Sequence, residues 1–287
     1  MELIFAAACC SVLISILLKL AKTKGFNALH MIAWNYASAS LLCLLWFKPD
    51  LQHISVSHTP WLLIIALGIL LPSIFLCLAK SLHHAGIINT EIAQRLSVVL
   101  SLLAAFFIFQ EQFNHLKIIG IALGILAVLS ILFSQQRNQK AKASSKQAMF
   151  YLVLVWFGYA LIDVLLKYTT GLGIQFAVVL NLMFICAFIL SLVYILFTSK
   201  TFGHAKNIIA GLGLGVLNFA NIALYVKAHM LLKDTPAIVF AGMNILVVVL
   251  GACSGLMIFK EKLKLMTALG LLLGLASVIC LAYTLSV

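Results

Sequence analysis

Charge is the property that this sequence has least of. Of its 287 residues only 9% are charged, seven of them acidic, whereas 64% are hydrophobic. A water-soluble fold needs more polar surface than this composition can supply. The shortage of charge therefore excludes a soluble fold and places the chain in a lipid bilayer.

Several functional motifs are also missing. The seven cysteines show no C-x-x-C spacing, so we interpret them as small apolar packing residues. The neighbouring His83 and His84 would point apart on a helix, which argues against a metal site. No G-x-x-x-x-G-K-[ST] segment is present, so direct coupling to ATP is not supported. No basic residue precedes the first apolar run, which indicates a retained helix rather than a cleaved signal peptide. We expect neither a cofactor nor a metal.

Apolar runs long enough to cross a bilayer fill the rest of the chain. A helix needs about 20 mostly apolar residues to span the hydrocarbon core. Continuous runs such as residues 118–133 lack the alternation of a membrane β-barrel. The sequence therefore predicts an all-α polytopic membrane protein with ten transmembrane helices. The predicted helices are 2–19, 28–47, 61–80, 88–108, 117–134, 148–167, 175–197, 207–227, 236–258 and 266–285.

The two halves of the sequence resemble each other. The echoes are 98–111 with 248–261 and 120–124 with 270–274, both offset by 150 residues, and 13–19 with 161–167, offset by 148. We interpret residues 1–134 as a first five-helix repeat, 135–147 as a basic linker and 148–287 as a second repeat. Because five is odd, the second repeat must enter the membrane from the opposite side. Inverted repeats are typical of alternating-access carriers, whose substrate site lies near the bilayer midplane.

These repeats resemble a known family. The segments 109–111 and 259–261, an aromatic residue leading to Glu and followed by a Gly-x-x-x-Gly helix, are similar to the EamA-type repeat of the drug/metabolite transporter superfamily. The resemblance implies a central cavity lined by the first four helices of each half, with the fifth and tenth helices at the periphery. A proline that this family often carries about a dozen residues before the Glu is replaced by Val98 and Val248. Gating by a kink at that proline is therefore not expected.

Polar residues inside the predicted spans are the candidate functional residues, because an ionisable side chain at mid-bilayer costs roughly 2.5 to 3.5 kcal/mol. Helical spacing places them on shared faces that could line one cavity. The substrate-binding candidates are Arg95, Gln94, Trp34, Asn35, Trp156, Tyr159, Asn218, Asn221, Tyr225 and Asn244. The candidates for gating or proton coupling are Glu91, Asp163, Lys19, Lys80, Lys167, Lys227 and His30.

Each candidate also has a structural interpretation. Glu91 and Arg95 are four residues apart and can simply pair on their helix, as can Asp163 and Lys167. The lysines can extend to the headgroups, and Asn181, like the other asparagines, can form interhelical hydrogen bonds. The repeated acids before the Gly-x-x-x-Gly helices, Glu111 and Glu261, are expected to be solvated or to bridge helices. The glycine pairs 120/124 and 270/274 suit close packing within a half or across a homodimer of helices five and ten.

The basic residues predict an orientation. Loops on one side of the predicted topology carry 13 Lys and Arg residues and loops on the other carry five, with Arg95 inside a span. The positive-inside rule puts the richer side in the cytoplasm and both termini outside. Members of the resembling family usually have cytoplasmic termini, so the two indications disagree and we follow the charge count. Attraction to anionic lipid accounts for the net charge of +12 without a nucleic-acid partner.

The predicted function is secondary transport of a small polar metabolite across a bacterial cytoplasmic (inner) membrane by alternating access. An amino-acid-like or other zwitterionic or anionic solute would suit Arg95 beside aromatic and amide groups. Proton coupling and uncoupled exchange or export are both consistent with the sequence. The alternatives are a membrane enzyme acting on a lipid-linked substrate, and a non-transporting accessory or sensor subunit with the carrier fold.

Overall fold

The helices lie where the apolar runs predict them. The computed structural model describes residues 1–51, 59–85, 87–136, 146–172, 175–199, 204–257 and 265–285, and among these residues all regular structure is helical. The elements are α1 (Glu2–Thr23), α2 (Ala28–Phe47), α3 (Trp61–His84), α4 (Ile87–Phe107), α5 (His115–Gln136), α6 (Lys146–Thr169), the 3₁₀ turn η1 (Thr170–Leu172), α7 (Gln175–Ser199), α8 (Ala205–Leu231), α9 (Pro236–Met257) and α10 (Leu265–Tyr283). Each predicted span coincides with one α-helix to within about one helical turn.

Within the described residues, seven segments are long and apolar enough to cross a membrane by length and composition. They are Leu29–Phe47, Trp61–Leu78, Lys146–Leu172, Phe176–Thr198, Ala205–Leu231, Pro236–Met257 and Leu265–Tyr283. Three shorter apolar segments lie at Glu2–Leu18, Ile92–Phe107 and His115–Ile131. The chain is therefore a helical membrane protein, and crossing of the bilayer by the three shorter segments stays a prediction.

Local chemistry sets where several helices begin and end. The side chain of Asn27 accepts a hydrogen bond of 3.0 Å from the Leu29 amide and so caps the N-terminus of α2. At the other end of α2, Lys48 adopts a left-handed backbone conformation with φ 45°. Pro236 occupies the first position of α9, where its missing N–H costs no intrahelical hydrogen bond.

The helices pack as two compact units. Unit 1 comprises Met1–Cys9, Leu76–Val164 and Lys227–Val287, and unit 2 comprises Cys10–Phe75 and Leu165–Val226. Both units combine helices from the two predicted repeats. Packing therefore follows a different division from the one along the sequence, and the repeat boundaries at 134 and 148 stay a prediction.

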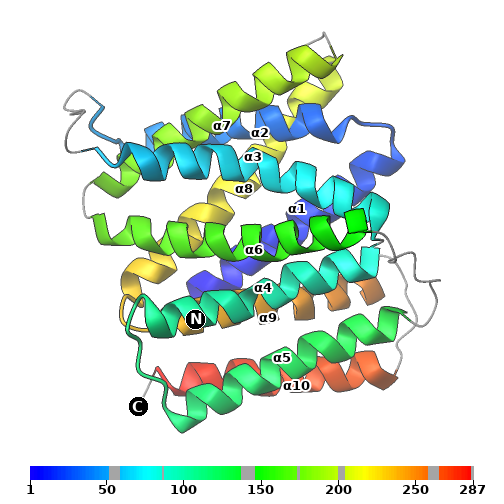
Figure 1. Cartoon of the computed structure of the whole chain (residues 1–287), viewed down its shortest axis with the longest axis vertical. Helices are drawn as coiled ribbons and strands as arrows, with labels where there is room; N and C mark the ends of the chain where they lie inside the picture. Colours follow the sequence, from blue (N-terminus) through cyan, green and yellow to red (C-terminus); the bar gives the residue numbers. More distant parts are fainter. Residues whose placement is uncertain are drawn as a thin grey trace. The chain divides into compact units, whose positions relative to one another are not determined.

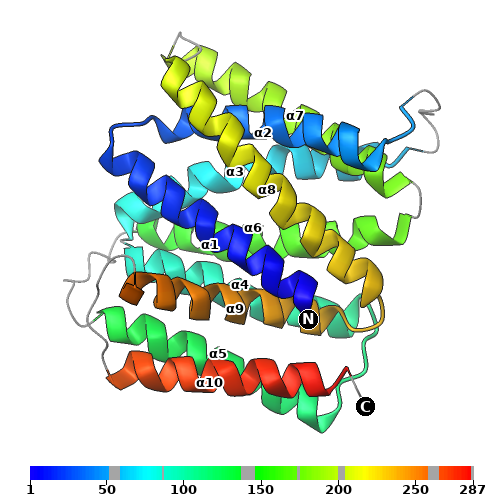
Figure 2. The same cartoon turned by 180° about the vertical axis from the view of Figure 1, so that it is seen from behind.

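In unit 1, corresponding helices of the two predicted repeats pack in antiparallel pairs. The α5 and α10 helices lie side by side (Figures 1 and 2), and the Ser277 hydroxyl of α10 donates to the Gly120 carbonyl of α5 at 2.5 Å. Farther along α5, Ile131 lies against Gly270, near the start of α10. In the second pair, α4 and α9 run in opposite directions (Figures 1 and 2), and Ile92, near the start of α4, joins an apolar cluster with Val248, just past the middle of α9.

The α2 and α7 helices of unit 2 also pair in antiparallel orientation (Figures 1 and 2). Near the start of α2, the Trp34 ring lies 5.7 Å from that of Phe188. At the end of α2, the Phe47 ring lies 5.2 Å from that of Phe176, at the start of α7. The pair thus joins the second helix of each predicted repeat.

Both chain termini lie at the same end of unit 1. Ile4 packs against Gly242 in the second turn of α9. Leu281, near the end of α10, packs against Gly120 in the second turn of α5. The connection between α4 and α5 reaches the first turn of α9, because the Glu111 carboxylate accepts a hydrogen bond from the Ala237 amide.

Candidate functional site

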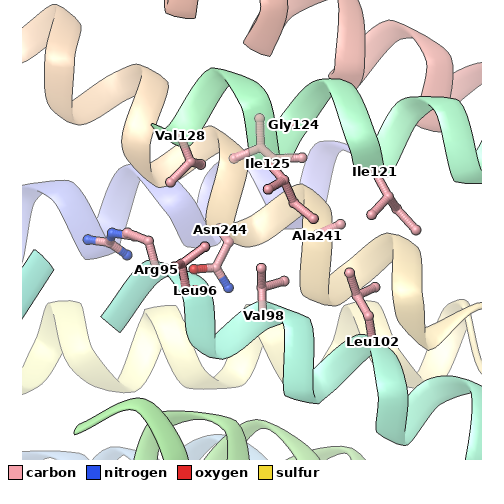
Figure 3. Close-up of a pocket in the computed structure, with 11 residues that line it drawn as sticks. Arg95, Leu96, Val98, Leu102, Ile121, Gly124, Ile125, Val128, Ala241 and Asn244 are labelled. Carbon is pink, nitrogen blue, oxygen red and sulfur yellow. The ribbon is translucent and has the colours of Figure 1, made fainter. Parts of the chain in front are cut away.

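A small pocket in unit 1 brings together two residues that the sequence singles out, Arg95 and Asn244. It has a volume of about 10 Å³, on the order of the space that one water molecule needs. Helices α4, α5 and α9 supply its lining (Figure 3). The lining residues are Arg95, Leu96, Val98, Leu102, Ile121, Gly124, Ile125, Val128, Ala241, Asn244 and Ile245.

Arg95 lies at one end of the pocket lining, whereas Asn244 lies among the apolar side chains (Figure 3). Figure 3 shows the guanidinium of Arg95 directed away from the apolar side chains, and the Asn244 amide close to Leu96 and Val98. The Asn244 amide nitrogen also donates to the Phe240 carbonyl, one turn earlier in α9, at 3.3 Å. As it stands, the pocket offers an amide and an apolar wall, and it is too small to enclose a metabolite.

The α4 helix is bonded to α6 by two predicted site residues. The Trp156 indole donates to the Leu96 carbonyl at 3.1 Å, and the Asp163 carboxylate accepts a hydrogen bond from the Ser101 hydroxyl at 3.2 Å. Tyr159 lies on α6 between these two contacts and is half-buried. The indole and the carboxylate therefore fix the position of α4 in this conformation. The pairing of Asp163 with Lys167 stays a prediction.

The second group of predicted substrate-binding residues lies in unit 2, on α2 and α8. These residues are Trp34, Asn35, Asn218, Asn221 and Tyr225. The two helices approach closely because Gly211 lies against Met31 and Trp34, and Gly215 lies against the Asn35 carbonyl. Asn35 is 2% exposed and Tyr225 is 5% exposed, whereas Asn218 and Asn221 are half-buried.

The interhelical role expected for Asn181 is confirmed. Its amide nitrogen on α7 donates to the Ser40 carbonyl on α2 at 2.8 Å. A side-chain donor paired with a carbonyl of a neighbouring helix holds the two helices together where water is excluded.

The candidates for gating or proton coupling are in contrasting environments. Lys80 and Lys227 are exposed, as side chains that extend to the headgroups would be, while His30 and Lys167 are 3% and 7% exposed. The side chains of Lys19 and Glu91 lie outside the described residues, as do His83 and Glu261. Within the part of the chain that the structure describes, no group of three His, Cys, Asp or Glu side chains could hold a metal ion.

Some contacts near the pocket were not predicted from the sequence. The apolar wall of the pocket includes Ile121 and Gly124 of α5, a helix that the family resemblance puts at the periphery. Lys117, at the start of α5, is 5% exposed and forms an ion pair with Glu111. The expectation that Glu111 bridges helices is confirmed, but its lysine partner is six residues away across a loop, a spacing that no helical rule predicts.

The fold and these polar faces define a class, the polytopic α-helical membrane proteins. Comparison with known proteins then gives the family: residues 2–133 match the EamA-like transporter family. A protein of Haemophilus influenzae described only as uncharacterized is 38% identical over 289 residues, covering 98% of this chain and 97% of that protein. The chain belongs to the EamA-like transporter family, in the drug/metabolite transporter superfamily.

A solved structure shares this fold. A chain of known crystal structure superposes with a TM-score of 0.74 at 12% sequence identity, covering 99% of this chain and 96% of that one. At this level of identity the likeness concerns the fold alone.

Proposed function

We propose that the chain is a secondary carrier of a small polar metabolite that works by alternating access between two inverted five-helix repeats. Membership of a transporter family supports carriage rather than catalysis. A bacterial relative supports a bacterial cytoplasmic membrane as the location. The proposal further needs an architecture with two equivalent ends, and the packing of α5 against α10 supports one.

The observation that carries the proposal is the reciprocity of the α5–α10 contacts. The contacting pairs are Gly120 with Leu281, Gly124 with Ser277, Ala127 with Gly274, and Ile131 with Gly270. The repeat offset of 150 converts one pair into another. Position 120 plus 150 is 270, and 131 plus 150 is 281, so the pair of Gly120 with Leu281 corresponds to the pair of Gly270 with Ile131. A two-fold axis relates contacting residues in this reciprocal way. Because α5 and α10 are antiparallel, the axis is perpendicular to them, as inverted repeats require.

The solute class follows from the groups near α4. A guanidinium binds a carboxylate through two parallel hydrogen bonds, and amide or indole groups such as those of Asn244 and Trp156 suit the rest of an amino-acid-like solute. The pocket beside Arg95 has room for about one water molecule, so a metabolite would enter only after its lining side chains rearrange. The candidates on α2 and α8, which belong to unit 2, stay sequence-based predictions of further solute ligands.

Counterflow in proteoliposomes tests the proposal. Vesicles containing the purified full chain are loaded with one unlabelled amino acid, and entry of the same radiolabelled amino acid is followed for each member of a panel. We expect transient accumulation of at least one zwitterionic or anionic solute above protein-free vesicles. An imposed pH gradient would change net uptake if transport is coupled to protons and would leave it unchanged for an uncoupled exchanger. Absence of counterflow for every solute would contradict the carrier and favour an accessory or sensor role.

A further inference from the structure

A buried ion pair lies at the end of unit 1 that holds both termini. Glu111, in the connection between α4 and α5, is 3% exposed, and Lys117, in the first turn of α5, is 5% exposed. The distance from Lys117 Nζ to Glu111 Oε1 is 2.8 Å. Neither residue belongs to the proposed transport site. A buried charge is tolerated only with a compensating partner, and here each of the two residues compensates the other.

The cluster joins three elements. The second carboxylate oxygen of Glu111, Oε2, accepts a hydrogen bond of 2.6 Å from the Ala237 amide in the first turn of α9. The Lys117 ammonium also donates to the Gln112 carbonyl at 2.9 Å and lies 5.6 Å from the centre of the Phe113 ring. Both oxygens of the carboxylate are thereby engaged, one by a cation and one by a backbone amide that has no intrahelical partner.

The helix dipole and the balance of charge both stabilise this contact. A carboxylate at a helix N-terminus is favoured by the helix dipole as well as by the hydrogen bond. The nearby lysine balances its charge, so neither ion is left unpaired in a region closed to water. Removing one partner of such a pair is far more damaging than replacing both by uncharged groups of similar shape.

The backbone around Glu111 is positioned by contacts with α4 and α5. Gln110, the preceding residue, has a φ of 54°, in the left-handed region that residues other than glycine rarely adopt. The Glu111 amide donates to the Ala105 carbonyl of α4 at 3.0 Å. Asn114 caps α5 by accepting a hydrogen bond from the Lys117 amide at 2.8 Å. The connection is thus attached to α4 and α5 independently of α9.

We propose that Glu111 is a positioning residue for the transport site: its carboxylate, balanced by Lys117, fixes the first turn of α9 relative to α4 and α5. The contact lies about one to two turns before Ala241 and Asn244, which line the pocket beside Arg95. Displacing the start of α9 would therefore move these residues against α4. The consequence for transport rests on the proposed function, whereas the attachment of α9 does not.

The two repeats differ at this cluster. The position 150 residues after Glu111 is again an acid, Glu261, but the position 150 residues after Lys117 is Thr267, which carries no charge. The same ion pair cannot form at the equivalent spacing in the second repeat. We infer that this charge-balanced anchor belongs to one end of unit 1.

Hydrogen–deuterium exchange of the purified full chain tests the anchor without any solute. The variants are Glu111→Gln, Lys117→Met and the double variant, with Glu2→Gln as a control because Glu2 is an exposed acid at the start of α1. We expect exchange of the Ala237 amide and its neighbours in the first turn of α9 to be roughly 10 to 100 times faster in each single variant. The double variant should recover most of the protection, because a glutamine carbonyl can still accept from Ala237 and no charge is left unpaired.

The pattern of exchange decides the outcome. Acceleration confined to the start of α9, rescued in the double variant and absent in Glu2→Gln, supports the anchor. Unchanged exchange at Ala237 in both single variants would overturn it, as would equal acceleration in α2 and α7, which would indicate general unfolding. If the wild-type chain also shows no counterflow, the carrier proposal fails while the exchange result still stands.

Discussion

Arg95 is the residue whose presence in a predicted membrane span most requires an explanation. Placing such a charge near the bilayer centre costs roughly 2.5 to 3.5 kcal/mol, and the side chain borders a pocket that its own helix shares with α5 and α9. Either a structural ion pair or the binding of a solute carboxylate would offset this free-energy cost. The two roles differ in how they respond to a substitution that keeps the charge.

We predict that Arg95→Ala lowers counterflow at subsaturating solute to near background while leaving membrane insertion and folding intact. The guanidinium is the group proposed to bind the solute carboxylate, and its removal would cost about 1.5 to 3 kcal/mol of binding, or roughly 10- to 100-fold in the half-saturating concentration. Counterflow and size-exclusion chromatography in detergent measure the two properties on the same preparation.

Arg95→Lys is the matched control. It keeps the charge but not the planar pair of donors, so solute recognition would still be weakened. A purely structural role would be largely preserved by lysine. Wild-type transport by Arg95→Ala at equal expression would remove Arg95 from the mechanism.

At the scale of elements, the contact between α5 and α10 depends on glycine. Gly120, Gly124, Gly270 and Gly274 are all buried, and each faces the other helix of the pair. Close approach lets the Ser277 hydroxyl reach the Gly120 carbonyl. These glycines therefore pack within one chain, between α5 and α10. A homodimer through helices five and ten would need other surfaces of those helices.

We predict that Gly124→Ala destabilises the chain by about 1 to 3 kcal/mol, because the added methyl group has no space. A Cβ at Gly124 would lie 2.8 Å from the Ser277 hydroxyl and would overlap the Ile245 side chain. Thermal unfolding in detergent, followed by the circular dichroism of the helices, measures the effect.

Gly213→Ala in α8 provides the comparison. A Cβ at that exposed position would have no neighbouring atom within 4 Å. Alanine there should leave stability unchanged or raise it by about 0.5 to 1 kcal/mol, since it restricts the unfolded backbone. Equal effects of the two substitutions would show that the α5–α10 contact is looser than the distances at Gly124 indicate.

At the scale of the whole molecule, the position of the termini bears on orientation. Both termini lie at one end of unit 1, as an even number of membrane crossings requires. Which side of the membrane that end faces depends on the loops. The count of 13 basic residues on one side of the predicted topology against five on the other predicts that the termini lie outside.

We predict that alkaline phosphatase fused to either terminus is active in bacterial cells, because this reporter folds only outside the cytoplasm. Fusion to the loop after α5, on the more basic side, should be inactive and serves as the internal control. Activity only of the loop fusion would show that the termini are cytoplasmic, as the family resemblance implies, and that the charge count is wrong for this chain.

Some properties of the protein follow from its sequence alone. The helix positions do, because the thickness of the hydrocarbon core sets the length of each apolar run. The resemblance between residues 98–111 and 248–261 likewise indicates the family, because both segments carry the same motif. The hydropathy of a segment depends only on its own residues, so it can be calculated from the sequence without the tertiary structure.

Only the tertiary structure identified the contacts that position the site. Glu111 and the Ala237 amide are 126 residues apart, and Ser101 and Asp163 are 62 apart. Such pairs meet because helices pack against one another, and helical periodicity gives a residue's face but not its neighbour. The structure also showed that the void beside Arg95 is bounded by α5, since the close approach allowed by Gly124 brings that helix against α9 and α10.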